Sequence, residues 1–284
     1  MIAFLGTGML GSGFVRAQRR RGEVVAVWNR THDRAVALEA YGAKAFEDPA
    51  EATRGASRVH LSVSDDAAVD DILERARPGL EPDVVIVDHT TTTATGTAAR
   101  AARWQERKIA FIHAPVFMGP QNALESTGLM LVSGDPARIE QVRPALELMT
   151  GKLLELGARV DAAAAFKLMG NCFLMFLTTG LAEMLMLAKV TGIAPEDAVK
   201  LFDAFNPGAT INARAKRMLD GNWSEPSWEL SMARKDARLM LEEAAAAKLT
   251  LSVLPAIAQR MDDVIAQGHG KSDWTVIAKD ALTK

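Results

Sequence analysis

The chain has 284 residues, of which 49% are hydrophobic and 24% charged, and its formal net charge at pH 7 is −2. This length favours two domains, and the composition is that of a globular protein with a sizeable core. The small net charge argues against nucleic acid or an anionic membrane surface as the main partner. The single cysteine, Cys172, excludes a disulfide within the chain. Because the first residues also lack the pattern of a signal peptide, we expect a cytoplasmic protein.

A glycine pattern follows the first apolar segment of the chain. Residues 1–5 are strand-like and run into Gly6-x-Gly8-x-x-Gly11, after which a helix is expected at 12–21 and a second strand at 24–28. Strand, glycine turn, helix and strand in this order are typical of a dinucleotide-binding unit. The phosphates of the dinucleotide would lie at the positive end of the helix. We therefore expect the cofactor to contact Gly6, Thr7, Gly8, Met9, Leu10 and Gly11.

The hydrophobic pattern divides the chain into two parts. Up to residue 160, strand-like and helix-like segments alternate, which predicts a doubly wound, mainly parallel α/β sheet of the Rossmann type. Further strands are expected near 44–46, 58–63, 84–87, 109–112, 129–132 and 152–156. From residue 161 the pattern is helical, with breaks at prolines and glycines. The sequence therefore predicts a cofactor-binding domain over 1–160 and an all-helical domain over 161–284.

The start of the second part contains an almost wholly apolar run, residues 168–188. Such a run is long enough to span a bilayer. However, Asn171 and Glu183 lie inside the run and Lys167 lies at its edge, and each is unfavourable in lipid. We therefore expect a long interdomain helix that is buried between domains or subunits, and no membrane partner.

The end of the second strand carries the residues that choose between two cofactors. At this point, about 20 residues past the glycines, an acidic side chain would bind the ribose of NAD. The chain instead has Asn29-Arg30-Thr31, with Arg34 one turn later. An arginine forms charge-assisted hydrogen bonds to a phosphate, so we expect NADP(H) in preference to NAD(H). The alternative interpretation is that Arg30 is a solvated surface charge.

Lys167 and Asn171 are four residues apart in the predicted long helix and therefore share a face. In one interpretation Lys167 is a general acid/base whose pKa is lowered by burial and by the nicotinamide charge, and Asn171 holds the substrate oxygen. In the other, Lys167 extends to water from the helix edge and Asn171 bonds to a neighbouring helix. Spacing alone leaves both open.

A set of motifs in a fixed order resembles the β-hydroxyacid dehydrogenase family, which includes 3-hydroxyisobutyrate and 6-phosphogluconate dehydrogenases. The motifs are Gly6-Thr-Gly-Met-Leu-Gly11, Asn29-Arg-Thr31, Ser62-Val-Ser-Asp-Asp66, Asp88-His-Thr-Thr91, His113-Ala-Pro-Val116, Lys167-Leu-Met-Gly-Asn171, Lys235-Asp236 and residues 268–274. The resemblance implies that Lys167 and Asn171 are catalytic. It further implies cofactor contacts at Val63, Ser64, Thr91 and Lys235. A homodimer or homotetramer is also implied.

The chain departs from this family where the resemblance places the substrate, against Val116, Phe117, Met118, Gly119, Lys167 and Asn171. The family has Ser-Gly-Gly after Val116, and that segment grips the substrate carboxylate. This chain has Phe117-Met118-Gly119 instead. Either the substrate is different or more apolar, or Phe117 and Met118 pack into the core while Gln121 or Asn122 supplies the donor. Both interpretations stay open.

The resemblance therefore implies an NADP(H)-dependent oxidoreductase that interconverts a hydroxy-acid-type alcohol and its aldehyde or ketone. Hydride would pass to or from nicotinamide, with Lys167 as the general acid/base and a small molecule as substrate. Two alternatives are an imine reductase-like NADPH enzyme, although that group generally replaces the lysine, and a non-catalytic cofactor-binding regulatory protein. No metal site is expected, because the histidines at 60, 89 and 113 lack metal-ligand spacing.

Overall fold

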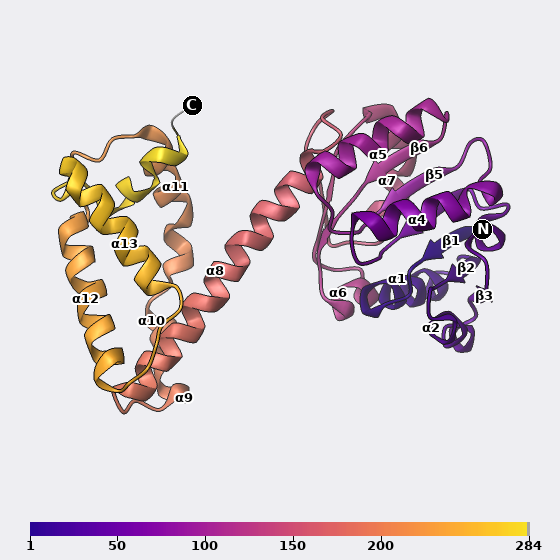
Figure 1. Cartoon of the computed structure of the whole chain (residues 1–284). Helices are drawn as coiled ribbons and strands as arrows, with labels where there is room; N and C mark the ends of the chain where they lie inside the picture. Colours follow the sequence, from indigo (N-terminus) through magenta and orange to yellow (C-terminus); the bar gives the residue numbers. More distant parts are fainter. Residues whose placement is uncertain (283–284) are drawn as a thin grey trace. The chain divides into compact units, whose positions relative to one another are not determined.

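The computed structural model describes residues 1–282. These residues form two compact units, one of Met1–Cys172 and one that begins at Phe173. Figure 1 labels the elements of each unit.

Unit 1 is built around a six-stranded parallel sheet with the order β3-β2-β1-β4-β5-β6. Its strands are β1 (Ile2–Leu5), β2 (Val25–Trp28), β3 (Lys44–Phe46), β4 (Arg58–Leu61), β5 (Val85–Asp88) and β6 (Ala110–His113). This is the strand order of a doubly wound dinucleotide-binding fold, which places a ligand crevice where the order reverses, beside β1 and β4. The predicted Rossmann-type domain is confirmed.

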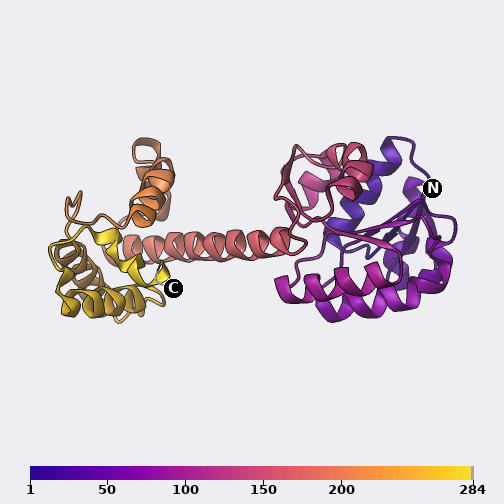
Figure 2. The same cartoon turned by 90° about the horizontal axis from the view of Figure 1, so that it is seen from above.

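Helices cover both faces of this sheet because successive strand residues point to opposite sides. One core contains Phe4 and Val27 and is covered by α1 (Met9–Arg20) and α7 (Pro136–Glu147). The other contains Leu5 and Leu61 and is covered by α3 (Pro49–Thr53), α4 (Asp66–Ala76) and α5 (Ala94–Glu106). Figure 2 shows α4 and α5 side by side along one face.

A second, three-stranded sheet in unit 1 was not predicted. It has the order β7-β8-β9, from β7 (Val116–Phe117), β8 (Leu129–Val132) and β9 (Lys152–Glu155). The expected strands near 129–132 and 152–156 are therefore present, but they pair with each other and not with the main sheet. A short helix, α6 (Pro120–Glu125), separates β7 from β8. After β2 the chain forms α2 (His32–Val36) and a 3-10 turn at Glu39–Tyr41.

The second unit is helical, as predicted. A long helix, α8 (Ala162–Val190), begins in unit 1 and continues into the second unit. The other helices are α9 (Pro195–Ala198), α10 (Leu201–Ala204), α11 (Ile211–Asp220), α12 (Leu230–Ala246) and α13 (Leu254–Val264), with 3-10 turns at Pro207–Thr210 and Trp274–Ala281 and a π turn at Ile265–His269. Leu230, Met261, Val264 and Val276 form part of its core.

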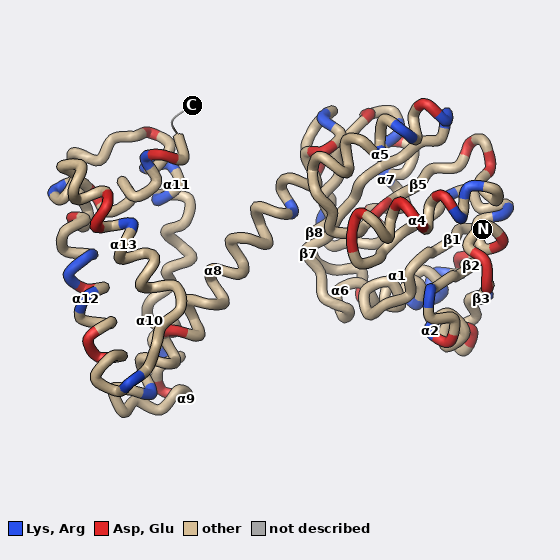
Figure 3. The backbone as a smooth tube through the Cα atoms, viewed as in Figure 1, with Lys and Arg blue, Asp and Glu red and all other residues tan. Residues whose placement is uncertain are grey.

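The apolar run of α8 is exposed within the single chain, so the expected burial of this helix between domains or subunits stays a prediction. The exposed fractions of Phe173, Met175 and Phe176 are 54%, 67% and 60%. No charged residue occurs between Lys167 and Glu183, and Figure 3 shows this stretch in tan. By length and composition alone the helix could cross a membrane, which is weak evidence because helices of soluble proteins pass the same test. The single chain therefore does not supply the expected burial.

Glu183, the acidic residue within this run, has a structural partner. Its carboxylate accepts hydrogen bonds from the backbone N–H groups of Ser252 and Val253, both at 2.5 Å, and of Leu254 at 3.0 Å. These amides lie at the start of α13, where a helix has unpartnered donors and a positive dipole end. Glu183 therefore joins α8 to the N-terminus of α13.

Candidate cofactor and catalytic site

The glycine turn is wedged between β1 and the end of β4. Gly6 has φ +95°, and a Cβ atom there would lie 2.2 Å from the carbonyl oxygen of Ser62. A Cβ at Gly11 would lie 2.0 Å from the carbonyl oxygen of Gly6. At Gly8, by contrast, a Cβ would meet nothing within 4 Å. Gly6 and Gly11 are therefore required by packing, whereas Gly8 leaves open space beside the backbone.

This open space lies at the start of α1. Gly8 is the N-cap of that helix and supplies no capping side chain. The first backbone N–H groups of a helix have no intrahelical partner, and they carry the positive end of its dipole. A phosphate group fits such a position. The structure therefore offers the geometry that the glycine pattern predicts for a pyrophosphate.

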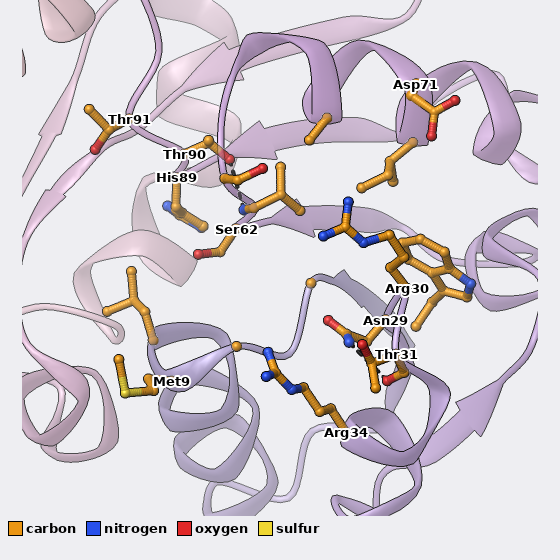
Figure 4. A pocket seen from close by; sticks show the side chains of 18 of the residues that line it. Met9, Asn29, Arg30, Thr31, Arg34, Ser62, Asp71, His89, Thr90 and Thr91 are labelled. Carbon is orange, nitrogen blue, oxygen red and sulfur yellow. Dashed lines mark hydrogen bonds between the residues drawn. The ribbon is translucent and has the colours of Figure 1, made fainter.

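A cavity of about 500 Å³ opens beside this turn (Figure 4). Such a volume is ordinary for a small-molecule or cofactor site. Its lining consists of Gly6, Gly8, Met9, Leu10, Trp28, Asn29, Arg30, Thr31, Arg34, Ser62, Val63, Ser64, Ala68, Asp71, Ile72, Arg75, His89, Thr90, Thr91, Val116, Met118 and Lys167. Most residues singled out from the sequence therefore surround one space, because the carboxyl ends of β1, β2, β4 and β5 meet at one edge of the sheet.

Asn29 fixes the loop at the end of β2. Its Oδ1 accepts a hydrogen bond from the backbone N–H of Thr7 at 3.0 Å, and its Nδ2 donates to the carbonyl oxygen of Thr31 at 2.9 Å. Arg30 and Arg34 project their guanidinium groups into the cavity (Figure 4). The loop therefore presents Arg30 and Arg34 to the cavity, whereas the Asn29 side chain is engaged in hydrogen bonds with the protein backbone.

Residues of α4 that line this end of the cavity were not predicted. Asp71 and Arg75 come from α4, and they form an ion pair at 3.8 Å. The guanidinium of Arg75 also lies 5.1 Å from the ring centroid of Trp28, which lines the cavity too. Nothing local in the sequence indicates that a face of α4 lies against Trp28 of β2. The contact between Arg75 and Trp28 forms only through tertiary packing.

A hydrogen bond joins the segments that follow β4 and β5, and both segments line the cavity. The backbone N–H of Val63 donates to Thr90 Oγ1 at 3.1 Å, and the backbone N–H of Thr90 donates to Asp88 Oδ1 at 2.9 Å. Asp88 is fully buried, and burial raises the pKa of its carboxyl to about 6, against hydrogen bonds from Thr90 that lower it. These bonds fix the backbone next to Ser64 and Thr91.

A buried histidine chain runs beneath the same edge. Arg58 Nε donates to His60 Nε2 at 2.7 Å, His60 Nδ1 lies 2.9 Å from His89 Nε2, and His89 Nδ1 lies 2.7 Å from the carbonyl oxygen of Ala114. Arginine only donates and a carbonyl only accepts. Both histidines are therefore neutral with the proton on Nδ1. Burial lowers the pKa of His60 well below its usual value and that of His89 to about 4.

The hydrogen bonds from Arg58 through the two histidines to Ala114 position the segment that follows β6, on the proposed substrate side. Ala114 accepts from His89, and its own N–H donates to the carbonyl oxygen of Asp88 at 2.7 Å. Val116, two residues later, is 4% exposed and lines the cavity. His60 and His89 therefore have a positioning role in the wall of the site, which the isolated histidines of the sequence did not indicate.

Lys167 lies on the first turns of α8 and lines the same cavity. Its side chain is 8% exposed, so it does not extend to water along the helix edge. Its Nζ donates to Asn171 Oδ1 at 3.0 Å and lies 4.0 Å from the centroid of the Phe117 ring. Burial lowers the pKa of Lys167 from its usual 10.5. The structure thus brings the lysine, the amide and Phe117 together.

The other predicted residues are placed as follows. Phe117 is half-buried, and the backbone N–H of Gly119 donates to Asn122 Oδ1 at 2.9 Å. Lys235 belongs to the second unit, where it forms an ion pair with Asp236 at 2.8 Å. Contact of Lys235 with the cofactor stays a prediction.

Two sequence families match the chain. The first, the NAD binding domain of 6-phosphogluconate dehydrogenase, matches residues 1–157. The second, described as NAD-binding of NADP-dependent 3-hydroxyisobutyrate dehydrogenase, matches residues 161–280. Together they cover nearly the whole chain, in the order that the motifs indicated.

Individual relatives agree with these matches. An uncharacterized oxidoreductase of Shewanella frigidimarina is 28% identical, over 96% of this chain and 94% of that protein. The cytokine-like nuclear factor N-PAC of Homo sapiens is 29% identical over 84% of this chain, but the match spans only 44% of that longer protein.

Solved structures of similar fold include two imine reductases. The enzyme of Myxococcus stipitatus in complex with NADP+ has a TM-score of 0.92 and 18% identity, covering 98% of this chain and 99% of that one. The imine reductase of Streptomyces aurantiacus has a TM-score of 0.89 and 25% identity, covering 100% and 99%. A variant of the Myxococcus enzyme was solved with NAD+. The likeness therefore establishes the fold and leaves the choice between the two nicotinamide cofactors open.

Proposed function

The chain belongs to the 6-phosphogluconate and 3-hydroxyisobutyrate dehydrogenase family of NAD(P)-binding oxidoreductases, and we propose that it interconverts an alcohol and its aldehyde or ketone. The observation that carries this proposal is the nearly buried Lys167, bonded to Asn171 on the wall of the cavity that the glycine turn opens. A lysine in this position needs a polar partner, and a substrate oxygen would supply one.

The proposed cofactor is NADP(H) in preference to NAD(H). The residues present fit it: Gly8 leaves room for a pyrophosphate at the start of α1, and Arg30 and Arg34 face the cavity beside the end of β2. Guanidinium groups form charge-assisted hydrogen bonds with a phosphate monoester. The remaining contacts proposed for the cofactor are those implied by the resemblance, at Thr7, Val63, Ser64, Thr91 and Lys235.

The proposed chemistry divides between the cofactor and the chain. When bound, the nicotinamide supplies or accepts the hydride. In the direction of reduction, the Lys167 ammonium donates its proton to the substrate oxygen as that oxygen gains negative charge. In the direction of oxidation, neutral Lys167 accepts the hydroxyl proton. The lowered pKa brings this group closer to neutral pH, where an acid/base catalyst is most effective. Asn171 Oδ1 accepts a hydrogen bond from Nζ at 3.0 Å and so positions the lysine.

Reduction of an imine is the second candidate, because imine reductases and a reductive aminase share the fold over nearly the whole chain. A cofactor-binding protein without turnover is the third candidate, and one matched relative, N-PAC, is named a nuclear factor and not an oxidoreductase.

One panel of substrates separates the three candidates. NADPH oxidation is followed with neutral aldehydes and ketones, 3-oxo acids, glyoxylate and cyclic imines, for the wild type and for Lys167→Ala. Turnover of a carbonyl compound that is lost in the variant supports the alcohol–carbonyl reaction. Turnover of imines that survives in the variant supports the second candidate. Tight NADPH binding without turnover of any compound supports the third.

We also propose how the chain is organised in solution. The functional boundary is placed at 160/161, between the segments that the two families match. The exposed apolar side chains of α8 form a contiguous surface of the kind that marks an interaction site. A second copy of the chain is the proposed occupant, in a cytoplasmic homodimer or homotetramer. Light scattering coupled to size exclusion tests this: a monomer that needs no detergent, or a protein found only with membranes, contradicts it.

A further inference from the structure

We propose that Phe117 makes this site selective for neutral, apolar carbonyl compounds and closes it to oxo acids, whose carboxylate lies within one or two bonds of the reacting carbon. This inference rests on the proposed function, since it names the substrate class of the same site. It follows from how the donors around Lys167 are used.

The first step concerns the three N–H donors of the Lys167 ammonium. One is directed at Asn171 Oδ1, at 3.0 Å. The face of the Phe117 ring lies 4.0 Å from Nζ, which gives the ammonium a cation–π contact on a second side. A carbonyl oxygen can use the donor that is left. A carboxylate needs further donors to offset its desolvation, and the ring offers none.

The second step is that the ring cannot move toward α8. The closest approach is at Gly170, where a Cβ atom would lie 2.3 Å from Phe117 Cζ. The ring therefore occupies the space that any other residue at position 170 would need. The backbone of Phe117 is paired with Leu129 in the small sheet. Gly170 and the β7–β8 pair together hold the ring over Lys167.

The third step concerns replacement donors on the segment after Phe117. Asn122 Oδ1 accepts from the backbone N–H of Gly119 at 2.9 Å, and Asn122 Nδ2 donates to Thr127 Oγ1 at 3.0 Å. Gln121 Nε2 donates to the carboxylate of Glu125. Both amides that could replace the family's serine thus form hydrogen bonds within the segment of α6 and its flanking residues. This favours the interpretation of a more apolar substrate.

The fourth step is the distribution of positive charge around the cavity. The other cations of its lining are Arg30, Arg34 and Arg75. The first two follow β2 and the third stacks on Trp28 of β2, and β1, β4 and β5 separate that strand from β6. The segment after β6 contributes only Val116 and Met118 to the lining, both apolar. Lys167 is therefore the one lining cation on this side of the described cavity.

The test compares methyl acetoacetate with acetoacetate, which share the reacting ketone and differ in charge. With NADPH, we expect the wild-type kcat/KM for the ester to exceed that for the acid by at least about tenfold. Phe117→Ser, which opens the face of Lys167 and adds a hydroxyl donor, should reduce this ratio by about tenfold or more. Phe205→Ser is the matched control, the same substitution at a phenylalanine of the second unit that is 53% exposed and does not line the described cavity, and should change the ratio by less than about threefold.

A binding measurement keeps this inference separate from the proposed function. The ester and the acid are each titrated into the wild-type protein with NADP+, which cannot reduce them, and binding is measured by isothermal titration calorimetry. Preference for the ester without turnover of either compound would contradict the proposed reaction and support the inference. Equal or tighter binding of the acid would overturn the inference, even with Lys167-dependent turnover. Failure of both compounds to bind would also overturn it.

Discussion

The two cations central to the proposed chemistry have opposite surroundings. Arg30 is exposed and projects freely into the cavity, whereas Lys167 is 8% exposed and holds Asn171 and Phe117. The residue types and their spacing made both residues candidates, but spacing left two interpretations of Lys167 open, and the family resemblance favoured a catalytic role. The contact of Phe117 with Gly170 was not predictable, because the two residues lie far apart in the chain and meet only through packing.

At this scale, Arg30→Ala should lower the preference for NADPH over NADH. A charged hydrogen bond is worth about 1.5–3 kcal/mol, so kcat/KM with NADPH should fall by about 10- to 100-fold while the value with NADH changes little. Arg54→Ala, which removes an exposed arginine paired with Glu51 outside the cavity, is the control. Equal losses with the two cofactors would show that Arg30 does not contact the 2′-phosphate.

Asn171→Asp should change the pH profile of carbonyl reduction. Reduction needs protonated Lys167, so the rate falls as pH rises through the pKa of this lysine, which burial lowers from 10.5. A carboxylate in place of Oδ1, 3.0 Å from Nζ in the wild type, favours the charged lysine and raises its pKa. The alkaline limb of kcat should therefore move to higher pH. An unmoved limb in the variant would mean that another group titrates.

Elements with a strong local signal were predicted well, and elements that exist only through pairing were not. The order of β1, α1 and β2 follows from hydrophobic period and glycine position within a short stretch of chain. Strand β7 has two residues and is a strand only because it pairs with β8. That pairing presents Phe117 to Lys167, so the part of the site that determines the substrate depends on an element without a local signature.

Two substitutions in one turn should separate packing from binding. Gly6→Ala places a Cβ 2.2 Å from Ser62 O at a positive φ and should lower the free energy of unfolding by about 2–4 kcal/mol. Gly8→Ala meets nothing within 4 Å and should leave stability within about 0.5 kcal/mol. Its methyl group would, however, stand where a pyrophosphate approaches, so NADPH should bind at least about tenfold more weakly. Urea denaturation and NADPH fluorescence measure the two effects. If Gly8→Ala bound NADPH as tightly as the wild type, the placement of the pyrophosphate against this turn would be wrong.

For the whole molecule, the sequence predicted two domains because the hydrophobic period changes along the chain. It placed their boundary at 160/161, whereas the compact units divide after Cys172. The difference arises because the first turns of α8, which carry Lys167, pack with unit 1. The sequence could not show what covers α8, since an apolar run has the same pattern in a buried helix and in an exposed interface.

The stability of the protein should fall in mild acid. Burial lowers the pKa of His89 and His113 to about 4 and that of His60 well below its usual 6.5. Between pH 6.5 and 4 the unfolded chain therefore binds more protons, and stability falls as pH falls. Asp88 opposes this, because its pKa is raised to about 6 and the folded state takes up its proton first. The net loss from pH 7 to pH 5 should be roughly 2–4 kcal/mol.

Urea midpoints at pH 7 and pH 5 measure this difference directly. An equal or higher midpoint at pH 5 would show that the buried histidines do not stay neutral as the hydrogen-bonded chain from Arg58 to Ala114 requires.

The central claim is that Lys167 moves the proton while a bound nicotinamide supplies the hydride. Single-turnover oxidation of NADPH, with the carbonyl compound that the wild type reduces fastest, tests it most directly in Lys167→Ala. We predict that this variant still binds NADPH and that its rate is lower by about 10²- to 10⁴-fold. A rate within about threefold of the wild type would contradict the claim, because no group on the lysine side chain would then be needed for the reaction.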